Sequence, residues 1–292
     1  MAVQWSLVLF TLFVCFGAGL FGAQGYLAML GKGKSLQMPA LIAAFASVVI
    51  GGIAAFTHLQ HWTRFFNGFL GNLQSGISLE LIIMVVLVIA MVVYFIFARK
   101  EEGVPKWLGI VAIVVAIVVA IVCAMSYLMP ARPAWNSPAT VVFYVANAIL
   151  FGAAAIWMIA GIKGDEEAAA SGATLTIVGA AVQAISAIYS FIVISGLSFA
   201  DVGYYFQTLA PTVHPVDPAA TSQILTGDCA LLFFGVYVVI GIVVPAVLAF
   251  LGKKNAKNAT AFGACSLVCA MAGGLAFRYI LYVAGVSAYL FY

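Results

Sequence analysis

Charged side chains are scarce in this chain of 292 residues. Asp, Glu, Lys and Arg make up only 7% of it, whereas they make up about 25% of a typical soluble domain. Hydrophobic residues make up 65%, and a soluble fold could not cover so much apolar material with so few charges. The composition therefore excludes a water-soluble globular protein. The net charge of +3 is small and gives no reason to expect nucleic acid as a partner.

The apolar runs also lack the alternation of polar and apolar residues that a membrane β-barrel requires. Residues 81–88, for example, read LIIMVVLV. Because every backbone polar group in lipid must be paired within the protein, uninterrupted runs of this kind indicate helices. We predict an all-α integral membrane protein, with residues 1–292 forming a single polytopic membrane domain.

About 20 apolar residues are needed for one helix to cross the hydrocarbon core. Eight runs are long enough, and the predicted membrane spans are residues 5–30, 38–58, 78–98, 106–129, 138–162, 170–195, 228–251 and 259–291. Two connections are long, 59–77 after the second span and 196–227 after the sixth. Since four spans restore the starting orientation, this order is compatible with two four-helix bundles.

The basic residues are distributed unevenly over the two sides of the predicted topology. Nine of them lie in the turns after the odd-numbered spans: Lys32, Lys34, Arg99, Lys100, Lys106, Lys163, Lys253, Lys254 and Lys257. The opposite side carries only Arg64 and Arg132. Basic residues accumulate in the cytoplasmic loops of membrane proteins. We therefore expect a multi-pass protein of the cell membrane whose termini and two long loops are extracytoplasmic.

Histidine is also rare, and this bears on cofactors. The three histidines are His58, His61 and His214, and none lies in the middle of a predicted span. Membrane haem is commonly held between histidines on facing helices, so we expect no haem. Cys265 and Cys269 share a helix face but lack a second pair of ligands, so the sequence predicts no metal site.

A few ionisable residues do fall at membrane depth, where they are costly and usually functional. His58 ends the second span, Glu80 opens the third, Asp228 opens the seventh, and Arg278 lies in the eighth, roughly 28 Å from its cytoplasmic end. The predicted topology puts all four in the outer leaflet. Each of these residues also has a structural alternative. Glu80 and Asp228 would be ordinary acids at helix N-termini. Arg278 would reach outward or pair with an acid, and His58 would be an interfacial histidine.

The loop after the second span is rich in aromatic residues around His58, His61 and Arg64. Such a loop suits a lipid–water interface, and it also suits the wall of a site for a flat, lipid-soluble ring such as a quinone. Quinol oxidation needs proton acceptors near the hydroxyls, and histidine is suited to this role. Our hypothesis is a quinol pocket with His58 and Glu80 as proton acceptors, lined in part by Ser78.

This segment resembles the DmsC-type membrane anchor subunits of dimethyl sulfoxide reductase-like molybdoenzymes. The similar pattern is His58-Leu59, Arg64, Asn67, Ser75, Ser78 and Glu80, with further likeness at Pro133 to Asn136 and at Gly274 to Arg278. The chain departs from the family's usual Gly, Pro and Ala at Gln60, Trp62 and Phe65. The bulkier turn puts the quinone specificity of this chain in doubt.

The resemblance implies a subunit of an anaerobic respiratory chain that oxidises menaquinol without haem or metal of its own. It implies a four-cluster iron–sulfur subunit and a molybdopterin catalytic subunit as partners. It assigns His58 and Glu80 to quinol binding, with His61, Arg64, Ser78, Asp228 and Arg278 as further candidates for the lining of the site. Whether the chain counts as an enzyme by itself stays open.

Three other interpretations remain. A small membrane transporter would place polar groups near the midplane, where Asn147 and Gln183 are expected. A quinone-interacting anchor of the polysulfide reductase type would do nearly the same work, and a purely structural anchor would only dock a partner. The long loop 196–227 is expected to pack over the outer helix ends, and we hypothesise that it contacts the iron–sulfur subunit.

Overall fold

The computed structural model describes residues 3–59, 61, 63, 66–70, 75–197, 221–253 and 256–287. Every regular element in these ranges is helical, and eight helical spans are long and apolar enough to cross a membrane. The predicted all-α membrane fold is confirmed. The spans are α1 (Trp5–Met29), α2 (Gln37–Phe56), α4 (Gly76–Ala98), α5 (Lys106–Met125), α6 (Pro138–Lys163), α7 (Glu166–Ser195), a π-helix (Leu231–Val243) continued by α9 (Val244–Gly252), and α10 (Ala259–Ala284).

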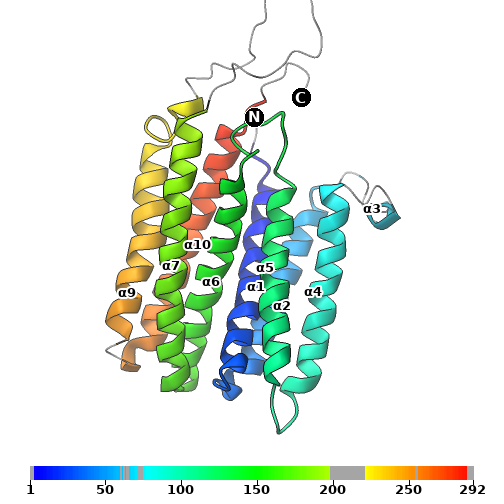
Figure 1. Ribbon diagram of the computed structural model, residues 1–292, viewed down its shortest axis with the longest axis vertical. Coiled ribbons are helices and arrows are strands. Elements are labelled where there is room, and N and C mark those ends of the chain that lie inside the picture. Colours follow the sequence, from blue (N-terminus) through cyan, green and yellow to red (C-terminus); the bar gives the residue numbers. More distant parts are fainter. Residues whose placement is uncertain are drawn as a thin grey trace, which may run out of the picture.

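Three elements differ from the sequence prediction. A four-residue helix, α3 (Asn67–Leu70), interrupts the first long loop and packs beside α4 (Figure 1). The seventh span is π-helical over its first 13 residues and turns α-helical at Val244, next to Pro245. Proline has no N–H to donate, which fits a position where the hydrogen-bond pattern changes. The last helix ends at Ala284, short of the predicted 291.

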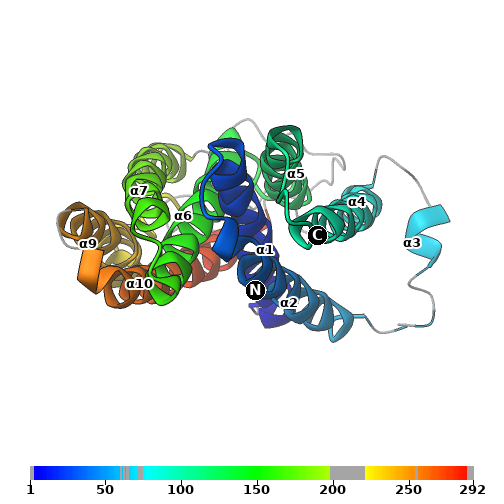
Figure 2. The ribbon, with the colours of Figure 1, turned by 90° about the horizontal axis from the view of Figure 1, so that it is seen from below.

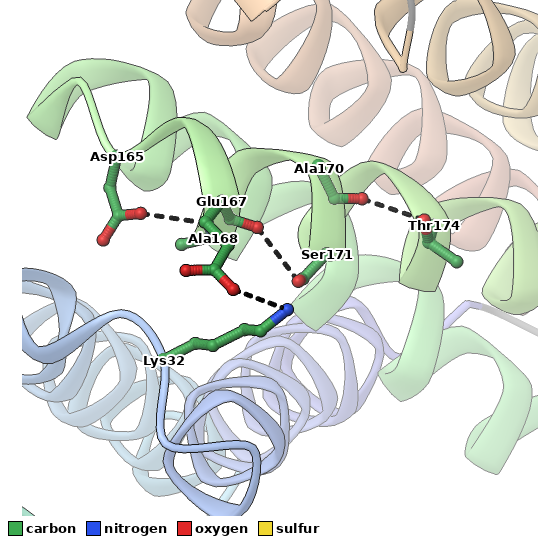
Figure 3. A network of polar contacts seen from close by, with 7 residues as sticks. All are labelled: Lys32, Asp165, Glu167, Ala168, Ala170, Ser171 and Thr174. Carbon is green, nitrogen blue, oxygen red and sulfur yellow. Dashed lines mark hydrogen bonds and ion pairs between the residues drawn. The ribbon is translucent and has the colours of Figure 1, made fainter.

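Local sequence signals fix several helix ends. The Ser137 hydroxyl accepts a hydrogen bond from the Ala139 N–H at 3.1 Å, with Pro138 at the first helical position of α6. Gly164 ends this helix with φ of 67°, a left-handed conformation that glycine adopts at little cost. Asp165 then caps α7 by accepting from the Ala168 N–H at 3.0 Å (Figure 3). The tight α6–α7 turn is therefore specified by its own residues.

The helices pack as two groups of four (Figures 1 and 2). In the first bundle α1 packs against α2 and α5, and α4 packs against α5 and more lightly against α2. In the second bundle α6 packs against α7 and α10, while the π-helix and α9 pack against α10 and α7. The two bundles meet chiefly where α1 lies against α6, with α5 and α10 adding smaller contacts.

The two ends of the bundle differ in charge. We call the end at which α1 begins and α10 ends the terminal face, which is uppermost in Figure 1, and the opposite end the basic face. The basic face carries the turns that hold the nine basic residues, although Lys254 lies outside the described residues. Lys32 pairs there with Glu167 at 3.0 Å, which ties the α1–α2 turn to the start of α7 (Figure 3). Arg132 lies at the terminal face, and Arg64 lies outside the described residues.

The interface between the bundles depends on glycine. A Cβ atom added to Gly19 of α1 would overlap the backbone carbonyl of Ala148 in α6, and one added to Gly152 would overlap the backbone of Gly19. Small residues let membrane helices approach until their backbones touch, which is a main source of helix association in lipid. This close approach brings α1 near enough to α6 and α10 for side chains of the two bundles to share one polar cluster.

We expect Gly19→Ala to destabilise the protein by about 1–3 kcal/mol, because the added methyl group must push α1 away from α6. The matched control is Gly52→Ala in α2, where an added Cβ atom meets nothing within 4 Å. Thermal unfolding of both purified variants in detergent measures the difference. Equal unfolding temperatures would show that the glycine contact does not hold the bundles together.

Candidate functional site

The centre of the polar cluster is Arg278 of α10, which is only 1% exposed. It lies six residues before the end of its helix, about 9 Å from the terminal face at 1.5 Å per residue. Its side chain does not reach outward to the surface, so the outward-reaching alternative is wrong. Among the residues that the structure describes, no carboxylate pairs with it either.

Neutral acceptors satisfy the Arg278 guanidinium instead. Its Nε donates to the Thr11 hydroxyl at 3.1 Å, and one terminal nitrogen donates to Asn147 Oδ1 at 2.6 Å and to the Gly274 carbonyl at 3.0 Å. The other terminal nitrogen donates to the Thr11 carbonyl at 3.3 Å. The rings of Phe143 and Tyr144 lie 5.1 and 5.0 Å away, in the range of cation–π attraction. This cation therefore joins α1, α6 and α10.

Glu80 approaches the cluster from α4. It lies one helical turn after Gly76, so both residues face α5. A Cβ atom at Gly76 would lie 2.9 Å from the Ser126 hydroxyl, so the glycine allows the start of α4 to touch the end of α5. The Ser126 hydroxyl interacts with the partly buried Glu80 carboxyl, yet it has no hydrogen-bond partner of normal geometry and its oxygen is buried. A buried hydroxyl without a partner is unfavourable, which marks this spot as one where a further polar group fits.

Two tyrosines meet where α5 and α10 end at the terminal face. The hydroxyl of Tyr127, just after α5, lies 3.3 Å from that of Tyr282 in the last turn of α10. Both tyrosines are buried and both interact electrostatically with Glu80. Tyr127 lies just outside the membrane span of α5, and burial raises its pKa well above the usual value. This phenol therefore stays neutral. Tyr144 also faces Tyr127, with ring centroids 5.6 Å apart.

The loop between α5 and α6 covers this tyrosine pair. Trp135 contacts the rings of Tyr127 and Tyr282, each at a centroid distance of 5.2 Å, and its indole N–H donates to the Leu281 carbonyl. Arg132 lies over the Trp135 ring and donates to the Gly285 carbonyl at 2.5 Å. The loop is thereby fastened to the end of α10 and covers the polar cluster at the terminal face.

The site residues predicted from the sequence do not all lie together. Ser78 is buried and Glu80 partly buried in the first turns of α4, whereas His58 and His61 are exposed near the end of α2. Neither histidine makes a hydrogen bond to Glu80 within the described part of the chain. Asp228 is exposed in the turn that precedes the π-helix. Arg64 and His214 lie outside the described residues, as do residues 198–220 of the second long loop.

The sequence analysis did not single out the hydroxyl residues of the cluster, which are Thr11, Ser126, Tyr127, Tyr144 and Tyr282. Hydroxyl residues at helix ends are too common to stand out. Asn147 was expected only as a central polar residue of the membrane domain, and it accepts a hydrogen bond from Arg278. Gln183 belongs to a separate contact, in which it donates to the Tyr237 hydroxyl at 2.7 Å. Within the described ranges, no group of three or more His, Cys, Asp or Glu side chains is arranged to hold a metal ion.

Comparison with known proteins gives one match that spans nearly the whole chain. The model of a protein family described as DMSO reductase anchor subunit (DmsC) matches residues 1–286. A search of the curated proteins found no match.

We expect Asn147→Leu to destabilise the protein by about 1.5–3 kcal/mol, the range for a lost hydrogen bond to a charged group. The matched control is Asn147→Asp, which keeps an acceptor at the same place and adds a charge opposite to that of Arg278. Thermal unfolding in detergent should therefore rank the leucine variant below the wild type and the aspartate variant level with it or above. A leucine variant as stable as the wild type would show that Asn147 does not hold Arg278.

Proposed function

Because the chain belongs to the DmsC family of DMSO reductase anchor subunits, we propose that it binds menaquinol at the terminal face and oxidises it. The electrons pass directly to an iron–sulfur partner subunit, which serves a molybdopterin catalytic subunit. The observation that carries the proposal is the partly buried carboxyl of Glu80 beside the buried hydroxyl of Ser126, which makes no hydrogen bond of normal geometry. A quinol hydroxyl is a polar group of the kind that this spot lacks.

Oxidation of a quinol releases two protons and two electrons, and the proposed residues account for the protons. Glu80 accepts a proton from one quinol hydroxyl, and Ser126 offers a hydrogen bond to the same oxygen. His58 lies exposed at the end of α2, so it can accept the proton of the other hydroxyl and release it to water. The chain supplies the ring site and the proton acceptors, while the partner subunit supplies the electron acceptor.

The charge distribution supports an orientation. Since the basic face carries most of the lysines and arginines, we assign it to the cytoplasm and the terminal face to the outside of the cell membrane. Electrons that leave the quinol without a haem require an acceptor close by. The iron–sulfur subunit therefore docks on the terminal face. Residues 196–227 remain our predicted contribution to that contact, although most of them lie outside the described residues.

The transporter alternative finds little support. The two central polar residues, Asn147 and Gln183, each bond to a side chain of a neighbouring helix. A cavity of about 220 Å³ does lie between α1, α5, α6 and α7, but its wall is apolar, with side chains such as Ile113 and Leu175. A polar solute would find almost no hydrogen-bonding surface there.

We expect Glu80→Gln and His58→Ala each to lower quinol oxidation at least tenfold in a complex that still assembles, because each removes a proton acceptor. The control is Glu101→Gln, which changes an exposed carboxylate on the basic face. The measurement is turnover with a menaquinol analogue per assembled complex, with and without a quinol-site inhibitor. If assembly fails while turnover per complex is unchanged, the cluster only docks the partner.

A further inference from the structure

We propose that the hydroxyls of Tyr127 and Tyr282 form the path by which protons leave Glu80 for the terminal face. This inference rests on the proposed function and names a role for two residues that the sequence did not single out. Their hydroxyl oxygens lie 3.3 Å apart, and either can donate to the other. Tyr127 directly follows Ser126, the residue that touches the start of α4, and Tyr282 lies in the last turn of α10.

The pair connects the residue beside Glu80 to the loop at the terminal face, because Tyr127 directly follows Ser126 and Tyr282 contacts Trp135, over which Arg132 lies. Glu80 interacts electrostatically with both tyrosines. At the other end Tyr282 interacts with Arg132, which is partly exposed in the loop at the terminal face. The positive charge of Arg132 disfavours an excess proton on its neighbours, so it biases the outer end of the path toward release.

A second branch of the cluster cannot serve as the outlet. From Tyr127 the neighbouring hydroxyl groups also lead inward to Tyr144 and Thr11, and from there to Arg278. Arginine stays protonated and has no acceptor atom, so a proton cannot pass through it. Arg278 is also only 1% exposed. The tyrosine pair is therefore the branch that leads outward.

The proton balance of the step is simple. When quinol is oxidised, the O–H bond breaks, the proton joins the Glu80 carboxylate and the electrons go to the iron–sulfur partner. The protonated carboxyl then gives its proton to one tyrosine oxygen while that hydroxyl passes its own proton to the next, and the last proton goes to water beside Arg132. Both tyrosines begin and end neutral, which is what the raised pKa of the buried Tyr127 requires.

Aromatic packing holds both rings in place independently of their hydroxyls. Trp135 contacts each of them at a centroid distance of 5.2 Å, and the two tyrosine rings lie edge to face at 6.2 Å. Replacing either tyrosine with phenylalanine therefore removes the proton-carrying oxygen and keeps the ring contacts. This makes phenylalanine variants a clean test of the path.

The experiment compares Tyr127→Phe and Tyr282→Phe with wild type in the assembled complex, using a menaquinol analogue. We expect kcat to fall about tenfold with KM unchanged, and the solvent deuterium isotope effect on kcat to rise, because proton release becomes limiting. The matched control is Tyr237→Phe, which removes another buried hydroxyl with a hydrogen bond, to Gln183 in the second bundle. It should leave both quantities at the wild-type level.

Two results would overturn the proposal. The first is an unchanged kcat and isotope effect in both variants while Glu80→Gln remains inactive, which would leave the quinol site standing and remove only the path. The second is a loss of kcat without a rise in the isotope effect, accompanied by a lower unfolding temperature, which would mean that the hydroxyls are merely structural. If Glu80→Gln itself keeps full turnover, the proposed function fails first.

Discussion

The structure depends on the way in which one buried cation is accommodated. An arginine at membrane depth loses its hydration, and the loss is tolerated only where other groups replace the water. Around Arg278 the replacements are two backbone carbonyls, a hydroxyl, an amide and two aromatic faces, drawn from three helices. Because none of these partners is charged, the positive charge is spread over its neighbours and not cancelled. The residues around it therefore sit in a positive field.

That field acts on the neighbouring ionisable groups. Arg278 interacts electrostatically with Cys15 and Cys123, and Glu80 interacts with the same two residues. Arg278 and Glu80 form no salt bridge with each other among the described residues, since the guanidinium donates only to Thr11, Asn147 and Gly274. The cation therefore leaves the oxygen atoms of Glu80 free of a direct ion pair.

The sequence predicted the features that come from composition and local signals. The shortage of charge and the length of the apolar runs were enough to predict eight membrane helices, and Arg278 stood out because a charge within such a run is rare. The sequence did not reveal its partners, since the expected partner was a carboxylate and the real ones are neutral. The contact between Tyr127 and Tyr282 joins residues 155 positions apart, and no local pattern encodes such a pairing.

The π-helix escaped prediction for a related reason. Leu231–Val243 is almost uniformly apolar, so its composition suits either helical form, and the segment packs mainly against α10. There Gly241 and Gly273 approach so closely that a Cβ on Gly241 would lie 2.7 Å from the Cα of Gly273. The predicted meeting of His58 with Glu80 also depends on the first long loop, whose described residues are few. Its geometry follows from tertiary contacts and not from the spacing of 22 residues.

The glycine contact between α1 and α6 has a consequence for the biogenesis of the protein. The cluster takes Thr11 and Tyr127 from the first bundle, and Asn147, Tyr282 and Arg278 from the second. Until the bundles meet, the guanidinium in a freshly inserted α10 lacks the acceptors that α1 provides. Packing of the two bundles against each other then gives the guanidinium N–H groups their acceptors. Hydrogen bonding therefore favours this packing, in addition to the close contact of the helices. A chain arrested before α10 would therefore hold the first bundle with an unfinished polar cluster.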